Sequence, residues 1–266
     1  MTSAQDYFPR LAEFPHAELF AGTRHVWEVL PRLQGYVREK ALDPGAPEAD
    51  AEDLRGLRVE DGMISSEGLF TAKRRFRIGR AELLIEAGAR MEPGVVIFGP
   101  AVLCEKADFR PGAYLRGGCL IGPGAVVGHA TEVKNSVFLN RAVAGHFAYV
   151  GDSLLGMGSN LGAGTKLANL QLRTEEEKRS RSGRNILIRV GRETVDTGLR
   201  KFGAVVGDDV EIGCNTVTSP GTLLGPGCWV VPNTTVPKGV HPPAHLILTP
   251  SRRPVAKPRR RPSVSP

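Results

Sequence analysis

The chain has 266 residues, of which 41% are hydrophobic and 6% aromatic, with 32 glycines and a net charge of +7. Six of the basic residues fall in the tail 251–266, which holds no acid, so the remainder is nearly neutral (7 − 6 = +1) and no nucleic-acid-binding fold is implied. No run of 18 apolar residues exists, so no membrane span is expected, and the N-terminus does not resemble a secretory signal.

The first 60 residues are predicted to form a helical cap and an acidic linker. Apolar residues recur at helical spacing over 17–41, and Pro31 is expected to break this run into two short helices. A turn-rich acidic linker follows at 42–53, and short strands then lead into a repeat. We expect the N-terminal piece to cap the first coil of that repeat, because an open end would expose unpaired strand edges.

Residues 61–240 are predicted to form one repeat domain, in which a residue at every sixth position from Ile85 onward is apolar, except at Thr218. Between the two regular blocks the spacing persists with one short step, at Val150, Leu155, Leu161 and Leu167. A period of six fits neither a helix nor an ordinary strand, but it fits a parallel β-helix in which three sextets make one coil. The regular positions stop before AGHFAYVGD at 144–152, and the full pattern returns near residue 206. The first block is Ile85, Met91, Ile97, Leu103, Phe109, Leu115, Ile121, Val127, Val133 and Leu139, and the second is Val206, Ile212, Thr218, Leu224, Val230 and Val236.

A charged insert at 170–201 separates the two blocks. Its apolar centre, ILIRV, is expected to form a strand. Long excursions from a compact solenoid are usually functional loops or disordered, and we expect this one to lean over a neighbouring subunit. The basic tail, 241–266, is expected to be disordered.

These features resemble the hexapeptide-repeat, left-handed β-helix acyltransferases over about 84–170 and 203–240. Residues 108–213 are most similar to the acetyltransferase half of the bifunctional bacterial enzyme that makes UDP-N-acetylglucosamine. The motifs in common are FRPGAYL, TEVKNS, AGHFAYVGD, SNLGAGT, LANLQ and RKFGAVVGDD, in this order. The resemblance implies a mainly β, left-handed parallel β-helix, a homotrimer with its active site between neighbouring prisms, and acetyl-CoA as the acyl donor without a metal.

The resemblance also implies roles for single residues. His146 would be the general base that removes a proton from the amine attacking the thioester. Basic residues would bind the phosphate of an amino-sugar phosphate, and polar residues would contact the sugar. The predicted substrate-binding residues are Arg110, Glu132, Lys134, Tyr149, Asn160, Asn169 and Lys201. Cys214 and Pro232 fall at the expected CoA groove, and the basic tail is a further candidate for contact with CoA phosphates.

The chain departs from this family in four places. Leu170 replaces a tyrosine, the loop from Asn169 to Lys201 is longer, and Trp229 and Pro232 replace small residues. No phosphate-loop motif follows a strand near the N-terminus, so the uridylyltransferase half is expected to be absent. A separate nucleotidyltransferase is then a candidate partner.

The predicted function is CoA-dependent N-acetylation of an amino-sugar phosphate such as glucosamine 1-phosphate. Two alternatives stay open: an O-acyltransferase acting on a UDP-sugar, and a non-catalytic subunit that binds a sugar phosphate and assembles with a nucleotidyltransferase. A γ-type carbonic anhydrase would need three metal-binding histidines on adjacent coils, and only His129 and His146 lie in the repeats. His129 is expected to be structural.

The four cysteines form no C-x-x-C motif. Reduced thiols are therefore expected, which favours a cytoplasmic protein. Cys214 and Cys228 are expected to be packing residues rather than nucleophiles.

Overall fold

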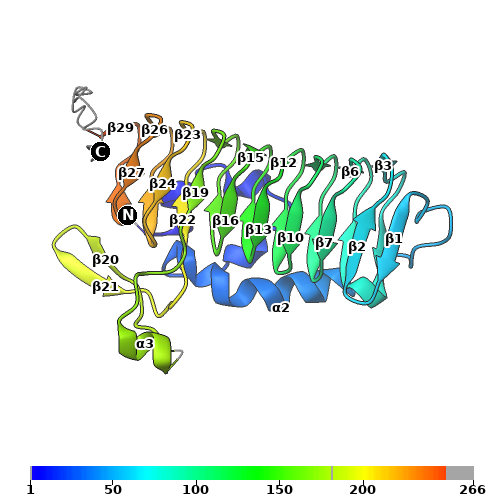
Figure 1. Cartoon of the computed structure of the whole chain (residues 1–266), viewed down its shortest axis with the longest axis horizontal. Coiled ribbons are helices and arrows are strands. Elements are labelled where there is room, and N and C mark those ends of the chain that lie inside the picture. The colour runs from blue at the N-terminus through cyan, green and yellow to red at the C-terminus, as the bar shows by residue number, and fades with distance from the viewer. Residues whose placement is uncertain (1, 181, 250–266) are drawn as a thin grey trace, which may run out of the picture.

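The computed structural model describes residues 2–180 and 182–249, so 250–266 of the predicted tail lie outside them. The predicted disorder is wrong for 241–249, because β29 (Leu246–Ile247) pairs with β26 (Trp229–Val230) in the last coil. The body of this described part is a parallel β-helix with three nine-stranded sheets, one along each side of a prism (Figure 1). Leu84 lies opposite Val102 in the next coil, and Val102 lies opposite Leu120. The predicted hexapeptide-repeat parallel β-helix is therefore confirmed.

Each coil visits three sides, which we call the covered, grooved and polar sides, in that order. The covered side holds β4 (Phe76–Ile78), β5 (Leu83–Ile85), β8 (Ala101–Leu103), β11 (Cys119–Ile121), β14 (Ser136–Phe138), β17 (Leu154–Leu155), β22 (Ala204–Val206), β25 (Thr222–Leu224) and β28 (Gly239–His241). The grooved side holds β3 (Phe70–Thr71), β6 (Arg90–Met91), β9 (Asp108–Phe109), β12 (Val126–His129), β15 (Val143–His146), β18 (Asn160–Leu161), β23 (Glu211–Ile212), β26 (Trp229–Val230) and β29 (Leu246–Ile247). The polar side holds β1 (Leu57–Glu60), β2 (Met63–Ser66), β7 (Val96–Phe98), β10 (Tyr114–Arg116), β13 (Glu132–Lys134), β16 (Tyr149–Gly151), β19 (Lys166–Leu167), β24 (Val217–Thr218) and β27 (Thr235–Val236).

Short helices and one hairpin complete the described part. The α-helices are α1 (Ala4–Tyr7), α2 (Val29–Ala41) and α3 (Glu175–Arg179). Single 3₁₀ turns are η1 (Leu11–Glu13), η2 (Ala17–Phe20), η3 (Val26–Glu28) and η4 (Gly79–Ala81), and the hairpin is β20 (Leu187–Val190) with β21 (Glu193–Asp196).

The regularly spaced apolar residues fill the inside of the prism, with one error in the predicted register. Leu139, the tenth position of the first block, does not point inward; Phe138 does. The cause is a turn after Lys134 that is one residue shorter than the turn after Arg116 in the preceding coil, so this coil has 17 residues. The interior then continues through Ala144 and Val150 at steps of six. The sixfold pattern therefore slips before His146 and does not stop there.

The first end of the prism is closed by strands rather than by helices. Strands β2, β3 and β4 run antiparallel to β7, β6 and β5, so the chain winds once in reverse before the parallel coils begin. The prediction that the helical N-terminal piece caps this end is wrong, because residues 63–78 occupy it.

The N-terminal segment instead lies along the covered side, with α2 parallel to the long axis of the β-helix (Figure 1). Near its start the Tyr7 carbonyl accepts a hydrogen bond of 2.9 Å from Asp208 N–H, and near the end of α2 Arg38 pairs with Glu82 at 3.0 Å. The predicted break at Pro31 is also wrong. Pro31 lies in the first turn of α2, where its missing N–H removes no helical hydrogen bond.

This arrangement explains why the strands of the covered side are apolar on both faces. Leu84, Val102 and Leu120 point away from the prism and are buried beneath the N-terminal segment, which contributes Trp27 and Leu33 to the same cluster. Burying such a side chain stabilises the fold by about 1.5–3 kcal/mol, so the segment is an integral part of the domain.

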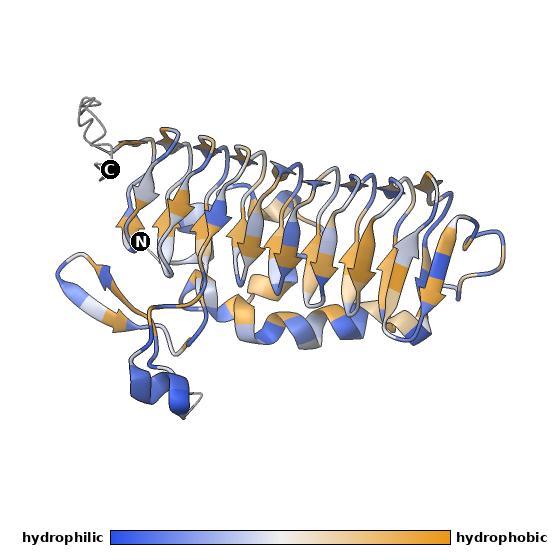
Figure 2. Cartoon of the chain, viewed as in Figure 1, coloured by the Kyte–Doolittle hydropathy of each residue, from blue (hydrophilic) through white to orange (hydrophobic). Residues whose placement is uncertain are grey.

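The insert continues this cover over the later coils. Ile186 and Ile188 are buried, and a Cβ on Gly221 would lie within 2.9 Å of both side chains. The expected strand in ILIRV is confirmed as β20. Helix α3 is hydrophilic throughout and projects from the body (Figure 2). Contact of the insert with a neighbouring subunit stays a prediction.

In the described residues, no helix has the length and apolar character that a membrane crossing requires.

Candidate functional site

The corner between the grooved and polar sides presents two histidines in consecutive coils. Strands β12 and β15 both end in Gly-His, and His129 lies opposite His146. A Cβ on Gly128 would lie only 1.7 Å from the carbonyl oxygen of Gly145, so only glycine fits between the two coils. Adjacent strands are about 4.8 Å apart, so the two histidines occupy neighbouring backbone positions along this corner, and the Phe147 ring contacts both imidazoles.

The two histidines have different surroundings. His129 Nδ1 lies 2.6 Å from the carbonyl oxygen of Pro111, so it carries the proton and donates. The exposed His146 ring has no hydrogen bond to any residue in 2–180 or 182–249, and the His146 backbone carbonyl accepts a hydrogen bond of 3.0 Å from Gly164 N–H. Phe147, in a left-handed conformation (φ +52°), is 56% exposed and contacts the His129 ring edge-on, with 5.2 Å between ring centroids. The His146 imidazole is thus available to an external partner.

The polar side brings four of the predicted residues together. We call this group, Glu132, Lys134, Tyr149 and Asn169, the polar cluster. Glu132 lies opposite Tyr149 in the next coil, and Lys134 ends the same strand as Glu132. The Tyr149 hydroxyl and the Asn169 amide both lie over Gly151, where a Cβ would come within 2.7 Å of each. Burial, and then the nearby Glu132 carboxylate, raise the pKa of Tyr149, so it remains a neutral hydrogen-bonding group.

Two further residues of this face were not predicted. Arg116 donates to Glu132 at 2.7 Å, and it ends its strand one coil before Lys134. Asp152, only 6% exposed, accepts hydrogen bonds from the amides of Asn135 (2.8 Å) and Asn169 (2.5 Å). The spacing of 18 residues between Arg116 and Lys134, one coil, was the signal in the sequence that could have found Arg116.

A pocket of about 290 Å³ lies between this part of the polar side and α2. Arg116 and Lys134 supply two positive charges to its lining, and Asp152 supplies one negative charge. The other lining residues are Leu30, Pro31, Gln34, Gly117, Gly118 and Asn135. Two cations in a concave polar surface suit an anion such as a phosphate.

Three predicted substrate-binding residues lie away from this cluster. Arg110 lies on the corner of the histidines, two coils before His146, and its Nε is 3.3 Å from the Asp108 carboxylate. Asn160 lies on the grooved side and donates to Glu211 at 2.9 Å. Lys201 lies at the end of the insert and lines a hollow described below.

A groove of about 430 Å³ runs along the grooved side and begins at β18, the strand next to β15. The two residues expected at the CoA groove, Cys214 and Pro232, both line it, together with Trp229 (62% exposed) and Leu246 (60% exposed). Its lining is mainly apolar. The expectation that Cys214 is a packing residue is wrong, because Cys214 is exposed, whereas Cys228 is buried as expected and burial raises the pKa of its thiol.

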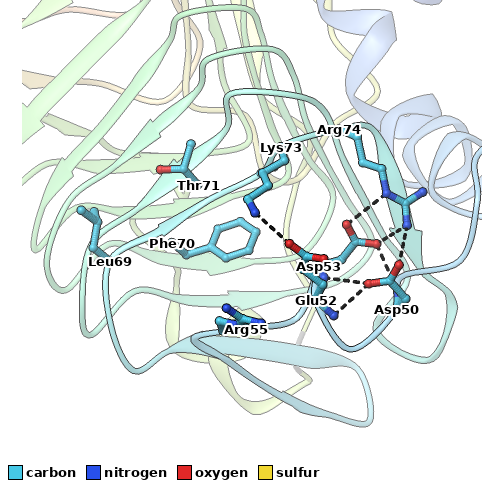
Figure 3. Close-up of a pocket in the computed structure, with 10 residues that line it drawn as sticks. Asp50, Glu52, Asp53, Arg55, Leu69, Phe70, Thr71, Lys73 and Arg74 are labelled. Atoms are coloured by element: carbon cyan, nitrogen blue, oxygen red, sulfur yellow. Dashed lines mark hydrogen bonds and ion pairs between the residues drawn. The ribbon is translucent and has the colours of Figure 1, made fainter.

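A further hollow near the closed end lies apart from the histidine corner (Figure 3). Its acidic residues are already paired: Arg74 binds Asp50 and Asp53, and Lys73 binds Glu52 at 2.8 Å. In the described ranges 2–180 and 182–249, no group of three or more His, Cys, Asp or Glu residues is arranged to hold a metal ion.

Curated relatives match the repeat region. The chain is 30% identical over 180 residues to the "Bifunctional sugar-1-phosphate nucleotidylyltransferase/acetyltransferase" of Sulfurisphaera tokodaii, covering 68% of this chain and 42% of that protein. It is 35% identical over 147 residues to the "Bifunctional protein GlmU" of Stutzerimonas stutzeri, covering 55% and 26%. The chain thus spans less than half the length of these relatives. No family model matches.

Among solved structures, the acetyltransferase domain of PglB from Neisseria gonorrhoeae, in complex with acetyl coenzyme A, covers 65% of this chain and 58% of that chain. The sequence identity is 15% and the TM-score 0.25, which is too low to support an argument about the site. The sequence matches and the coil geometry agree with each other. The chain has the parallel β-helix fold of hexapeptide-repeat proteins, and its repeat region is similar to that of bifunctional nucleotidylyltransferase/acetyltransferases.

Proposed function

We propose that the chain is a CoA-dependent N-acetyltransferase that acts on an amino-sugar phosphate, with His146 as the general base. The observation that carries this proposal is the position of the exposed His146 ring, which packs against Phe147 but has no hydrogen bond to a described residue. The apolar groove begins one coil after His146, at β18 on the grooved side of the prism. The polar cluster lies on the polar side, and His146 is at the corner between these two sides. A donor and an acceptor bound on these two sides would meet at His146. The similarity to a bifunctional sugar-1-phosphate nucleotidylyltransferase/acetyltransferase supports this proposal.

The reaction follows from these positions. The amine of the sugar attacks the thioester carbonyl carbon, a C–N bond forms and the C–S bond breaks. His146 takes the proton that the amine loses and passes it to the departing thiolate, which leaves as the CoA thiol. Lys134 and Arg116 would bind the phosphate, and Tyr149 and Asn169 would bind the sugar. Glu132, already paired with Arg116, would hold that guanidinium in place. Acetyl-CoA would lie in the groove beside Cys214 and Pro232.

A homotrimer is part of the proposal. The covered side is occupied by the N-terminal segment and the insert, which leaves the grooved and polar sides available to neighbouring subunits. A neighbouring copy facing this corner would exclude water from it and bring Arg110 or Asn160 of another subunit to the substrate. A cytoplasmic location and a separate nucleotidyltransferase partner are also proposed.

The test is release of CoA thiol by the purified protein supplied with acetyl-CoA and glucosamine 1-phosphate. Turnover that is lost in His146→Ala supports the proposal. Turnover only with hydroxyl acceptors such as a UDP-sugar would favour O-acylation, and binding of the sugar phosphate without any turnover would favour a non-catalytic subunit.

A further inference from the structure

The insert encloses a positively charged hollow of about 340 Å³ beside the polar cluster. Among the described residues, four basic side chains and one carboxylate line it, and together they carry a charge of +3 (4 − 1). The charged residues are Arg173, Arg184, Arg200, Lys201 and Glu177, and the remaining lining residues are Leu170, Gln171, Leu172, Ser182 and Gly183.

The one carboxylate in this lining, that of Glu177, already accepts hydrogen bonds within the insert. Glu177 accepts a hydrogen bond of 2.7 Å from Thr174 N–H and one of 3.3 Å from Arg184 N–H, and its pKa is lowered chiefly by the bond from Thr174. Its carboxylate also lies 4.0 Å from the Arg184 guanidinium. It therefore neutralises Arg184 at most.

The other three cations have no acidic partner in the part of the chain that the structure describes. Arg173, Arg200 and Lys201 are exposed and form no ion pair with any described residue. Three unneutralised positive charges around one concave surface repel one another, and a multiply charged anion bound among them would relieve that repulsion.

The hollow adjoins the proposed acceptor site through Asn169. Phe202 N–H donates to the Asn169 carbonyl oxygen at 3.0 Å, which closes the base of the insert and brings Lys201 beside the start of Leu170. The Asn169 amide binds Asp152 and lies beside the Tyr149 hydroxyl. A substrate lying over Tyr149 and extending past Asn169 would therefore enter the hollow.

We propose that the hollow binds the second phosphate group of a diphosphate-linked amino sugar, so that a sugar diphosphate conjugate is the preferred acceptor over a sugar monophosphate. This inference rests on the proposed acetyltransferase function. The rim of the hollow includes Leu170 (42% exposed) and Leu172 (94% exposed), an apolar surface suited to the group beyond the diphosphate, whether nucleoside or lipid.

The experiment compares acceptors and charge variants in the thiol-release assay. The acceptors are glucosamine 1-phosphate, UDP-glucosamine and a prenyl-diphosphate-linked glucosamine. The variant is Arg173→Gln combined with Arg200→Gln, and the matched control is Arg192→Gln, an exposed arginine in the turn of the insert hairpin outside the hollow.

We expect the double variant to raise the KM for the diphosphate acceptors by about tenfold, as loss of charge-assisted bonds does, while kcat and the KM for glucosamine 1-phosphate stay within about twofold. The control should match the unaltered protein. Preference for the nucleotide or for the lipid acceptor would identify the source of the diphosphate. An unchanged KM, or an equal rise for the monophosphate, would overturn the inference.

A different result is expected if the proposed acetyltransferase function is wrong. No acceptor would then release thiol, and the hollow would be tested by calorimetric titration with UDP alone. Binding that weakens about tenfold in the double variant and at high salt would support an anion site in the insert. No binding of UDP by the unaltered protein would overturn it.

Discussion

His129 and His146 occupy equivalent positions in neighbouring coils, yet within the described residues only the His129 imidazole forms a hydrogen bond. Its Nδ1 donates to the Pro111 carbonyl at 2.6 Å, whereas the His146 ring has no hydrogen-bond partner among the described residues. The bond from His129 agrees with the structural role expected for it. The His146 ring lies between the groove and the polar cluster. The proposed chemistry depends on this difference in hydrogen bonding between the two imidazoles.

The close approach of the two coils at this corner predicts unequal effects of two alanine substitutions. In Gly128→Ala the new Cβ would lie 1.7 Å from a backbone oxygen, so the coils must separate, and the free energy of unfolding should fall by about 3 kcal/mol or more. In Gly145→Ala the nearest atom is a Val143 methyl at 3.9 Å, so stability should change little. Denaturant unfolding of both variants measures this, and equal losses would contradict the packing described.

Asp152 is predicted to orient Asn169. Asp152→Asn removes one carboxylate acceptor but tolerates the left-handed backbone (φ +47°), so the free energy of unfolding should fall by about 1–3 kcal/mol through the weakened amide contacts. The KM for the acceptor should rise more than kcat falls. Asp61→Asn, at an exposed turn, is the matched control. A normal acceptor KM in Asp152→Asn would show that Asn169 needs no such support.

Cys214 should be the cysteine that iodoacetamide modifies in the folded protein. Cys104, Cys119 and Cys228 are buried, and burial raises the pKa of each of these thiols, whereas Cys214 is exposed in the groove. Saturating CoA should slow alkylation of Cys214 if CoA occupies the groove. Mass spectrometry of the alkylated chain locates the label, and a rate unaffected by CoA would place CoA elsewhere.

Stability should depend on pH through His16. This side chain is buried within the N-terminal segment, its Nδ1 lies 2.7 Å from the Tyr36 hydroxyl, and burial lowers its pKa below the usual histidine value of about 6.5. Below that value the unfolded chain takes up a proton that the folded chain does not. The free energy of unfolding should therefore fall as the pH drops from above 6.5 towards the lowered pKa. His16→Gln keeps a donor without titrating, so its unfolding curves at pH 7 and pH 5.5 should differ less; an undiminished pH dependence would exclude His16 as its source.

Much of the fold follows from the sixfold spacing, since nine of the ten positions in the first block point inward. The error at Leu139 arose because a period fixes an average and does not reveal a turn shortened by one residue. The covered side could have been foreseen. Runs such as Leu83–Ile85 and Ala101–Leu103 are apolar at every position, and a strand facing water on one side would alternate.

The candidate site was harder to predict than the fold. Motif order identified Glu132, Lys134, Tyr149 and Asn169, which the structure brings together. Spacing could not show that Asn160 lies on another side, that Arg110 is paired with Asp108, or that Lys201 belongs to the insert. These positions depend on which side of the prism each residue occupies and on how the insert folds back.

The measurement that tests the central claim most directly is the rate of CoA-thiol release by His146→Ala and His129→Ala in the same assay. We expect kcat to fall about 10²–10⁴-fold in His146→Ala, the usual contribution of a general base, and to stay within about threefold in His129→Ala. Equal losses in the two variants, or full activity of His146→Ala, would contradict the assignment of His146 as the base.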